Sequence, residues 1–277
     1  MRVGVFYHDE FARNGYYILR ERVRPGFEAL KDLVASGQVR VYTPEINKTV
    51  QRLLQATHTV SLIAEVKYEG EYEISLLSAA GVVEAAERLQ QDELDMAFCF
   101  VGAAGHHASR NKFWGFCFFN DVAMAVLRLQ EMGVKKILIV DVDPHFGDGT
   151  RDLLGGDPDV THVNFHSGMT DNENREWNNY DYGIGGATDE VFMNKLEAVL
   201  NRPFDFEFLI LIFGHDSHND DYGPFRLSQA AYPFLGSLMH RIAGGKPTLM
   251  VLSGGSQPEV AREAIPGLIK GFINSPG

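Results

Sequence analysis

The sequence predicts an α/β protein whose central sheet is mostly parallel and carries helices on both faces. Short β-branched apolar runs alternate with segments of helical periodicity, which is the pattern of a parallel sheet. Several of these runs also end in glycine, histidine or aspartate, and ligands collect beyond the carboxyl ends of parallel strands. The expected strands are residues 3–7, 39–42, 96–101, 136–142, 161–165, 206–213 and 248–252. The expected helices are residues 20–35, 76–90, 121–131, 189–200 and 227–242.

Length and composition predict a single domain over residues 1–277, since no break in composition divides the chain. Twenty-five basic against 37 acidic residues give a formal charge of −12, which argues against nucleic acid and favours a cationic small substrate. No apolar run reaches the roughly 20 residues of a membrane span, so we expect a cytoplasmic protein without a membrane partner. Cys99 and Cys117 lie in apolar contexts, which favours buried thiols. The pattern predicts no particular oligomeric state.

Five of the expected strands end in polar or glycine-rich segments. In chain order these segments are residues 102–107, residues 141–148, His166, residues 214–218 and residues 253–256. Because the carboxyl ends of parallel strands meet at one edge of a sheet, the five segments predict one site. The polar stretch 167–182 is expected to be a long loop over the same edge.

The fourth expected strand is apolar enough to be buried on both faces, and charged residues crowd at its end. Buried carboxylates are costly unless they are paired or bind an ion, so a cation is the simplest explanation for Asp141, Asp143 and Asp148. Asp143 and His145 are two apart in an extended segment and can share one ion, with Asp216 as third ligand. This set is typical of a catalytic divalent site, with zinc preferred and iron second. In the alternative, Asp148 caps a helix and His145 packs in the core.

His106 and His107 follow a glycine-rich turn and offer two imidazoles near the predicted metal. Histidine titrates near neutrality, so the pair suits a general base for metal-activated water and a partner for the leaving amine. If Asp143 binds the metal, Asp141 and Asp148 are free to orient the two rings. A purely structural role is the alternative for an isolated His-His pair, and the surrounding carboxylates favour the catalytic one.

An aromatic stretch, residues 113–119, follows the two histidines. Most of it is expected to pack in the core at a helix start that Asn120 caps, with Cys117 buried rather than reactive. One aromatic side chain next to Gly115 is the exception, because it could line a narrow apolar channel for an alkyl chain.

Four motifs together resemble the metal-dependent histone deacetylases and acetylpolyamine amidohydrolases, which have the three-layer arginase/deacetylase fold. The motifs are residues 105–108 (GHHA), 115–121 (GFCFFND), 141–150 (DVDPHFGDGT) and 214–218 (GHDSH). Their order and spacing match, and the resemblance covers the chain from residue 58 onwards.

The resemblance implies a role for each motif residue. The implied zinc ligands are Asp143, His145 and Asp216. The implied tandem histidines with their carboxylate partners are His106, His107, Asp141 and Asp148. A structural potassium ion is implied near Asp141, Asp143, His145 and Phe165, bound largely by backbone carbonyls. The implied substrate contacts are Gly115 and Phe116, together with the position that Ser256 occupies.

The sequence departs from the family pattern after the last strand. Active deacetylases carry a tyrosine there whose hydroxyl stabilises the tetrahedral oxyanion, and Ser256 stands in its place. Loss of one oxyanion donor typically costs about 3 kcal/mol, or roughly 100- to 1000-fold in rate. The residues that could replace the tyrosine are Gln257, Tyr180, Tyr182 and Tyr222. His215 and Tyr222 also stand where a phenylalanine and a Pro-Leu pair are commoner, which predicts a remodelled substrate entrance.

The main functional hypothesis is a zinc-dependent amidohydrolase that cleaves the acyl amide of a small cationic amine, such as an acetylpolyamine or an acyl-lysine. The first alternative is a weakly active or inactive member that binds zinc and an acyl amine or a partner protein. The second is a hydrolase of a more activated acyl bond, for which a missing oxyanion donor matters less. The presence of both histidines with all three ligands favours catalysis.

Overall fold

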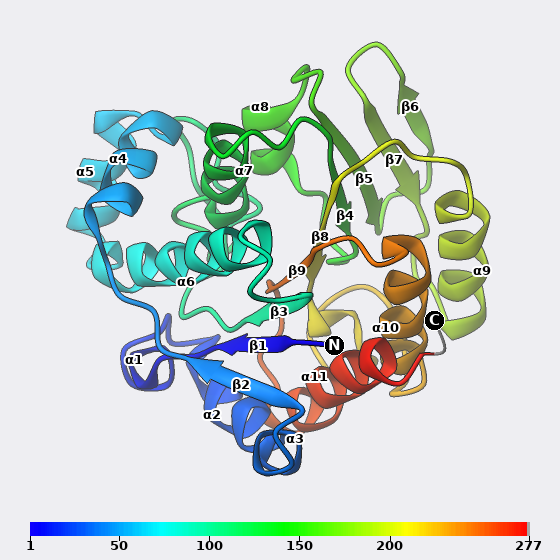
Figure 1. Cartoon of the computed structure of the whole chain (residues 1–277). Coiled ribbons are helices and arrows are strands. Elements are labelled where there is room, and N and C mark those ends of the chain that lie inside the picture. The colour runs from blue at the N-terminus through cyan, green and yellow to red at the C-terminus, as the bar shows by residue number, and fades with distance from the viewer. Residues whose placement is uncertain (276–277) are drawn as a thin grey trace.

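Nine strands form one sheet with helices packed on both faces, in a computed structural model that describes residues 1–275 (Figure 1). The order across the sheet is β2-β1-β3-β9-β8-β4-β5-β7-β6, and every pair is parallel except the antiparallel pair β6 and β7. The strands are β1 (Val3–Phe6), β2 (Val39–Tyr42), β3 (Met96–Cys99), β4 (Ile137–Asp141), β5 (Val160–His166), β6 (Asn172–Asn174), β7 (Asn179–Gly183), β8 (Phe208–Phe213) and β9 (Thr248–Leu252). The predicted α/β class with a mostly parallel sheet is confirmed.

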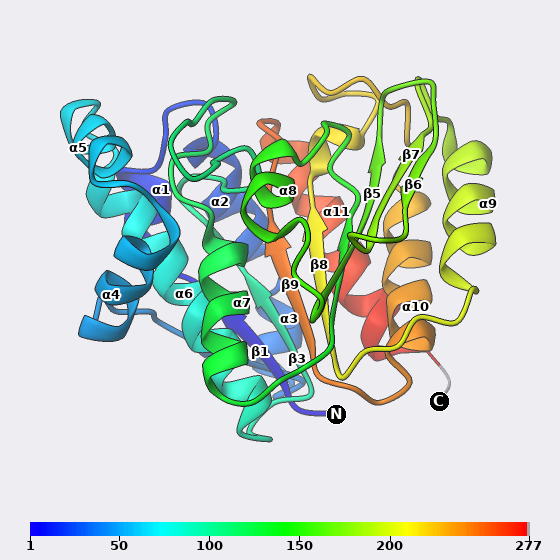
Figure 2. The same ribbon diagram turned by 90° about the horizontal axis from the view of Figure 1, so that it is seen from above.

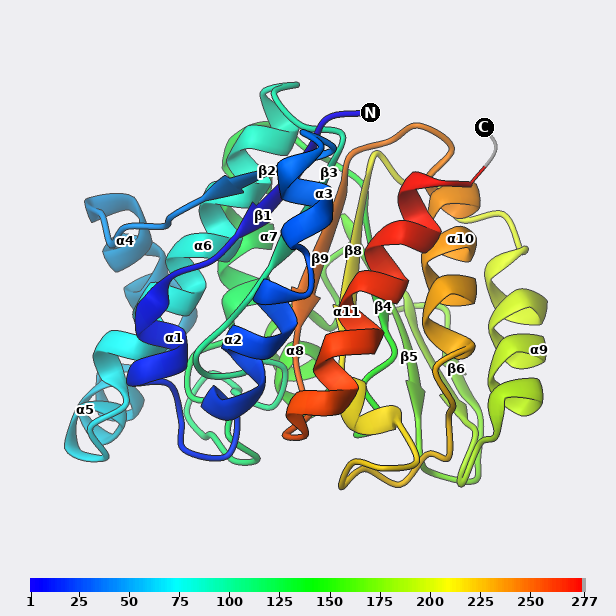
Figure 3. The ribbon, with the colours of Figure 1, turned by 90° about the horizontal axis from the view of Figure 1, so that it is seen from below.

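Eleven α-helices cover the sheet within residues 1–275. They are α1 (Asp9–Arg13), α2 (Arg20–Glu28), α3 (Lys31–Ala35), α4 (Lys48–Thr57), α5 (Val60–Tyr68), α6 (Tyr72–Gln90), α7 (Asp121–Glu131), α8 (Asp148–Leu154), α9 (Asp189–Leu200), α10 (Ala231–Ala243) and α11 (Pro258–Ile273). Helices α4 to α8 lie on one face of the sheet (Figure 2), and α2, α3, α9, α10 and α11 lie on the other (Figure 3). No helix in this part of the chain is long and apolar enough to cross a membrane.

The central strands have the composition of a sheet covered on both sides. Every residue of β4 and β8 is buried, and apart from Asp141 at the end of β4 both strands consist of leucine, isoleucine, valine and phenylalanine. Strands β3, β9, β8, β4 and β5 are neighbours in the sheet, so their carboxyl ends form one edge. The five polar strand ends therefore come together there, as the sequence predicts.

The stretch 167–182 is a loop only in part, which corrects the prediction. It contains β6 and most of β7, and β7 pairs in parallel with β5. Polar residues are tolerated in β7, next to the edge strand β6, because they find partners. The carboxylate of Asp181 accepts two hydrogen bonds from the guanidinium of Arg151 on α8, at 2.5 and 2.8 Å. Because its composition is typical of a loop, the strand β7, which pairs with the earlier strand β5, was not predicted.

Several helix predictions also change at their ends. Residues 20–35 form two helices, α2 and α3, because the chain turns at Ala29 and Leu30. The long helix α6 begins at Tyr72, four residues before its predicted start. The helices α1, α4 and α11 were not predicted. The predicted cap of α7 is confirmed, since Asn120 Oδ1 accepts a hydrogen bond from the Ala123 N–H at 2.9 Å.

Candidate active site

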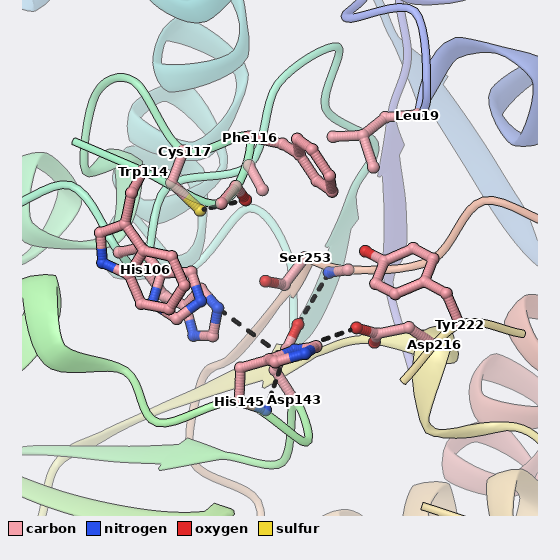
Figure 4. Close-up of a pocket in the computed structure, with 14 residues that line it drawn as sticks. Leu19, His106, Trp114, Phe116, Cys117, Asp143, His145, Asp216, Tyr222 and Ser253 are labelled. Atoms are coloured by element: carbon pink, nitrogen blue, oxygen red, sulfur yellow. Dashed lines mark hydrogen bonds and ion pairs between the residues drawn. The ribbon is translucent and has the colours of Figure 1, made fainter. Parts of the chain in front are cut away.

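A cavity of about 230 Å³ opens at the carboxyl edge of the sheet (Figure 4). It is lined by Leu19, Ala104, His106, His107, Trp114, Gly115, Phe116, Cys117, Asp143, His145, Asp216, Tyr222, Ser253 and Gly254. These residues come from the segments after β3, β4, β8 and β9, and from the chain before α2. The cavity thus collects most of the polar strand ends in one place.

Asp143, His145 and Asp216 lie together at the floor of the cavity, each offering a ligand atom within 4.8 Å of the others. Nδ1 of His145 lies 2.9 Å from Oδ1 of Asp143 and 3.2 Å from Oδ2 of Asp216. Both carboxylates are fully buried, and neither oxygen of Asp216 accepts a hydrogen bond from the described residues. A Cβ on Gly214 would collide with both carboxylates, so the backbone requires glycine beside them.

The electrostatics of this cluster fit a cation. Burial, and then the charge of Asp143, raise the pKa of Asp216 to about 7. Burial alone would lower the pKa of His145, but its hydrogen bond to Asp143 and the nearby charge of Asp216 raise it to about 10. Two buried carboxylates, one with no hydrogen-bond donor, are expensive without a neutralising ion. The donor set of two carboxylate oxygens and one imidazole nitrogen therefore fits a divalent metal.

Each of the two neighbouring histidines bonds its own carboxylate. Nδ1 of His106 lies 3.0 Å from Oδ2 of Asp141, and Nδ1 of His107 lies 2.7 Å from Oδ1 of Asp148. The ring centroids of the two histidines are 4.0 Å apart. We call His106, His107, Asp141 and Asp148 the histidine wall. Its two carboxylates, Asp141 at the end of β4 and Asp148 at the start of α8, both belong to the motif of residues 141–150.

The two imidazoles differ in charge preference. Burial lowers the pKa of His106, but Asp143 and Asp141 outweigh it and raise the pKa to about 9. Burial, and then the charge of His106, lower the pKa of His107 to about 4 despite its bond to Asp148. Two adjacent imidazoles with separated proton affinities are suited to hold and to pass on one proton.

Trp114 lines the cavity, although most of the aromatic stretch 113–119 was predicted to pack in the core. Its indole stacks on the ring of His107 with centroids 3.7 Å apart, and its Nε1 donates to Oδ2 of Asp148 at 2.9 Å. The backbone turns back at Gly115 and Phe116, which both have positive φ. A Cβ at Gly115 would approach Cδ2 of His107 to 2.7 Å, so glycine is required there. Phe116 lines the cavity, while Cys99 and Cys117 are free and buried, as predicted.

Ser256 does not line the cavity. Its hydroxyl donates to Oδ1 of Asp221 at 3.0 Å, and its backbone N–H also bonds this carboxylate. Asp221 further accepts from the N–H of Gln257 at 3.1 Å and lies 2.9 Å from Nδ1 of His215. Asp221 could not be identified from the sequence, because its partners His215 and Ser256 lie 6 and 35 residues away along the chain.

Tyr222 lines the cavity, unlike the other three residues considered as replacements for the missing tyrosine. Tyr180 and Tyr182 lie on β7, where the hydroxyl of Tyr182 donates to Glu173 at 2.7 Å. The side chain of Gln257 donates to Ser256. Partial burial, and then the charges of Asp216 and Asp143, raise the pKa of Tyr222, so its hydroxyl keeps its proton.

We call the residues around Tyr222 the tyrosine wall. It comprises His215, Asp221, Tyr222 and residues 253–257. Arg22 of α2, which the sequence did not single out as a site residue, is fully buried and donates to the backbone oxygens of Ser253 and Gly254. Figure 4 shows His106 and Tyr222 on opposite sides of the metal-ligand cluster.

The residues expected around potassium are close in the sheet. Asp141 ends β4 and pairs with Asn164 of the adjacent strand β5, one residue before Phe165. Asn164 Nδ2 also lies 3.4 Å from the backbone oxygen of Asp141. The geometry brings Asp141, Asp143, His145 and Phe165 to one end of two neighbouring strands.

Comparison with known proteins places this chain in a family. The family model described as "Histone deacetylase domain" matches residues 43–272. The chain belongs to the histone deacetylase family. It is 30% identical over 213 residues to histone deacetylase 18 of Arabidopsis thaliana, covering 67% of this chain and 31% of that protein. It is 31% identical over 209 residues to acetylpolyamine amidohydrolase of Mycoplana ramosa, covering 69% and 60%.

Other deacetylase-family proteins agree with this assignment. A probable deacetylase of Archaeoglobus fulgidus is 25% identical over 254 residues, covering 80% of this chain and 71% of that protein. The crystal structure of the HDA15 HD domain superposes with a TM-score of 0.86 at 22% identity, covering 98% of this chain and 89% of that one, and so shares the fold. The chain spans 60% or less of the length of the Arabidopsis and Mycoplana relatives.

Proposed function

We propose that this deacetylase-family chain is a single domain, residues 1–277, that hydrolyses the acyl amide of a small cationic amine. The observation that carries the proposal is the joint placement of the buried Asp143, His145 and Asp216 with two carboxylate-bonded histidines in one cavity. A protein that only bound a ligand would have no need for His106 and His107 beside such a cluster.

The proposed metal is zinc, with iron second, held by Asp143, His145 and Asp216. When bound, such an ion polarises the acyl carbonyl and lowers the pKa of a water molecule. A structural potassium ion is proposed near Asp141, Asp143, His145 and Phe165, where two adjacent strand ends present backbone carbonyls.

The histidine wall is proposed to move the proton. In both histidines Nδ1 is fixed by a carboxylate, so the tautomer and the ring orientation are set and Nε2 is left for the reacting groups. The pair takes one proton from water and gives one to the leaving amine. The second proton of the water also passes to the amine, so one amide and one water become a carboxylate and a protonated amine.

The lining of the cavity supports the substrate class. Leu19, Trp114 and Phe116 provide apolar surface around a small volume, which suits an alkyl chain ending in an acyl group. Gly115 and Phe116 are the proposed channel contacts. The acidic protein favours a cationic amine, and the similarity to acetylpolyamine amidohydrolase supports the same substrate class.

The test is a panel of acetyl-lysine, trifluoroacetyl-lysine and acetylpolyamine substrates, assayed with zinc-loaded protein. We expect cleavage of the acetyl substrates, strongest for the cationic amines. Cleavage of the trifluoroacetyl substrate alone would favour a hydrolase of activated acyl bonds. Binding of acyl amines without any cleavage would favour the inactive binding protein and overturn the proposal.

A further inference from the structure

The proposed reaction needs a hydrogen-bond donor at the acyl oxygen. Negative charge collects on that oxygen as water adds to the carbonyl, and a fixed donor there stabilises the transition state. The histidine wall lies on one side of the metal-ligand cluster and is used for the water and the leaving amine. The donor should therefore come from the other side, where the sequence has no tyrosine after Gly255.

Ser256 is already committed elsewhere. Its hydroxyl and its N–H both donate to the carboxylate of Asp221, at 3.0 and 3.1 Å, and its side chain lies outside the cavity. Asp221 also accepts from the N–H of Gln257, so the segment after Gly255 is held against this carboxylate. The serine is thus a structural contact between two loops.

Tyr222 is the next residue after Asp221 and brings a phenol into the cavity from the loop after β8 (Figure 4). The Gly255 N–H donates to the Tyr222 hydroxyl oxygen at 3.0 Å. This bond fixes the oxygen but uses only a lone pair, and no acceptor among residues 1–275 takes the phenol proton. The proton is free for a ligand in the cavity.

The ring is held from two sides. Its centroid lies 6.2 Å from that of His145 and 6.2 Å from that of Phe116, which meets it edge-on at 87°. Tyr222 keeps 44% of its surface exposed, in accord with a ring that faces an open cavity. The ring therefore lies beside both His145 of the metal-ligand cluster and Phe116 of the proposed substrate channel.

We propose that Tyr222 is a catalytic residue whose hydroxyl donates a hydrogen bond to the acyl oxygen of the substrate. This inference rests on the proposed function. The hydrogen-bond donor then comes from the loop after β8 and not from the loop after β9, where the family has its tyrosine. The Gly255 N–H fixes the Tyr222 hydroxyl, and Asp221 accepts the hydrogen bond of the Ser256 hydroxyl. The competing donor is Ser253, whose buried hydroxyl lines the cavity and has no partner among the described residues.

The first experiment measures kcat/KM of zinc-loaded protein on an acetyl-lysine amide and on its trifluoroacetyl counterpart. In Tyr222→Phe, which removes one oxygen, we expect a loss of roughly 100- to 1000-fold on the acetyl substrate. The loss on the trifluoroacetyl substrate should be much smaller, because its carbonyl is already activated. Tyr180→Phe removes a phenol hydroxyl outside the cavity and should match the wild type on both substrates. Equal losses on the two substrates, or none, would overturn the inference.

The second experiment needs no turnover. A trifluoromethyl ketone on a lysine-like chain hydrates to a tetrahedral mimic, and its affinity is measured by calorimetry in the wild type, Tyr222→Phe and Ser253→Ala, with zinc content determined for each. We expect Tyr222→Phe to bind roughly 10- to 100-fold more weakly at unchanged zinc content, since hydrogen bonds to charged groups are the strong ones. Equal affinity in Tyr222→Phe, or a loss confined to Ser253→Ala, would overturn the role of Tyr222.

The two experiments separate this inference from the proposed function. If the wild type cleaves the acetyl substrates but Tyr222→Phe does so equally well, the function stands and the inference fails. If the wild type cleaves nothing, yet the ketone binds in a way that depends on Tyr222, the proposed hydrolysis fails while the hydroxyl is still the donor to an acyl oxygen.

Discussion

The histidine wall and the tyrosine wall are held together in different ways. On the histidine wall, His106 bonds Asp141 at the end of β4, and His107 bonds Asp148 at the start of α8. On the tyrosine wall, the single carboxylate of Asp221 accepts hydrogen bonds from the loop after β9. The first wall consists of separate pairs. The second is a branched network in which His215, Ser256 and Gln257 share one acceptor. The difference teaches that proton-carrying groups are fixed one by one, whereas the donor for the acyl oxygen depends on how two loops meet.

The largest effect is expected from a change in the metal-ligand cluster, Asp143, His145 and Asp216, which lies between the two walls. In Asp216→Asn we expect loss of bound zinc and of activity, because one of three ligands becomes a neutral amide. The metal-free variant should nevertheless unfold at higher temperature than the metal-free wild type, since burial and Asp143 destabilise the Asp216 carboxylate. Metal analysis and calorimetry measure both effects.

The control for Asp216→Asn is Asp220→Asn, an exposed aspartate four residues further along the chain. It should retain wild-type zinc content and activity. Undiminished zinc in Asp216→Asn would remove this residue from the ligand set and leave the burial of its carboxylate between the two walls unexplained.

The histidine wall predicts a large loss of rate without loss of metal. His106→Ala and His107→Ala should each lower kcat by roughly 100- to 10,000-fold, since each removes a positioned proton carrier. Asp148→Asn should be milder, about 10- to 100-fold, because it only loosens the orientation of His107. Steady-state kinetics with zinc analysis tests this graded order. An Asp148→Asn variant as damaged as His107→Ala would show that the carboxylate does more than orient the ring.

The tyrosine wall predicts a loss of stability. Asp221→Asn keeps one acceptor oxygen but turns an amide N–H₂ toward donors, so several bonds to His215, Ser256 and Gln257 are lost. We expect a cost of about 1–3 kcal/mol in the free energy of unfolding by urea. Zinc content should be unchanged and kcat lowered, because the loop that fixes Tyr222 loosens. Stability equal to that of Asp220→Asn would contradict a network held by one carboxylate.

The contrast between the walls also explains what could be predicted from the sequence. Asp141, Asp143, His145 and Asp148 share one strand end, so a local motif on a predicted parallel strand is enough to bring them together. The bond from Gly255 to Tyr222 crosses between loops 33 residues apart, and no local pattern encodes it. The strand β7 was missed for a similar reason, since the partner of Asp181 lies on α8. Trp114 was missed because the turn at Gly115 reverses the direction of an aromatic run.

The smallest effect concerns a buried carboxylate, Asp121, whose Oδ1 packs so closely on Gly105, the residue before His106, that a Cβ there would collide with it. Asp121, in the first turn of α7, is fully buried, and burial raises its pKa to about 7 although its Oδ1 accepts a bond from the Val122 N–H. A carboxyl whose folded pKa lies above its unfolded value is destabilising when ionised. Its contribution to stability is present below the unfolded pKa and is lost as pH rises to about 7.

Asp121→Asn keeps the acceptor of the Val122 N–H and removes the charge. The variant should gain stability relative to the wild type as pH rises from the ordinary aspartate range to 7, by on the order of 1 kcal/mol per pH unit. Urea unfolding at a series of pH values measures this difference, and Asp205→Asn on the exposed surface should run parallel to the wild type. If the Asp121→Asn curve were also parallel, the buried carboxyl would be neutral throughout or solvated, and the raised pKa would be contradicted.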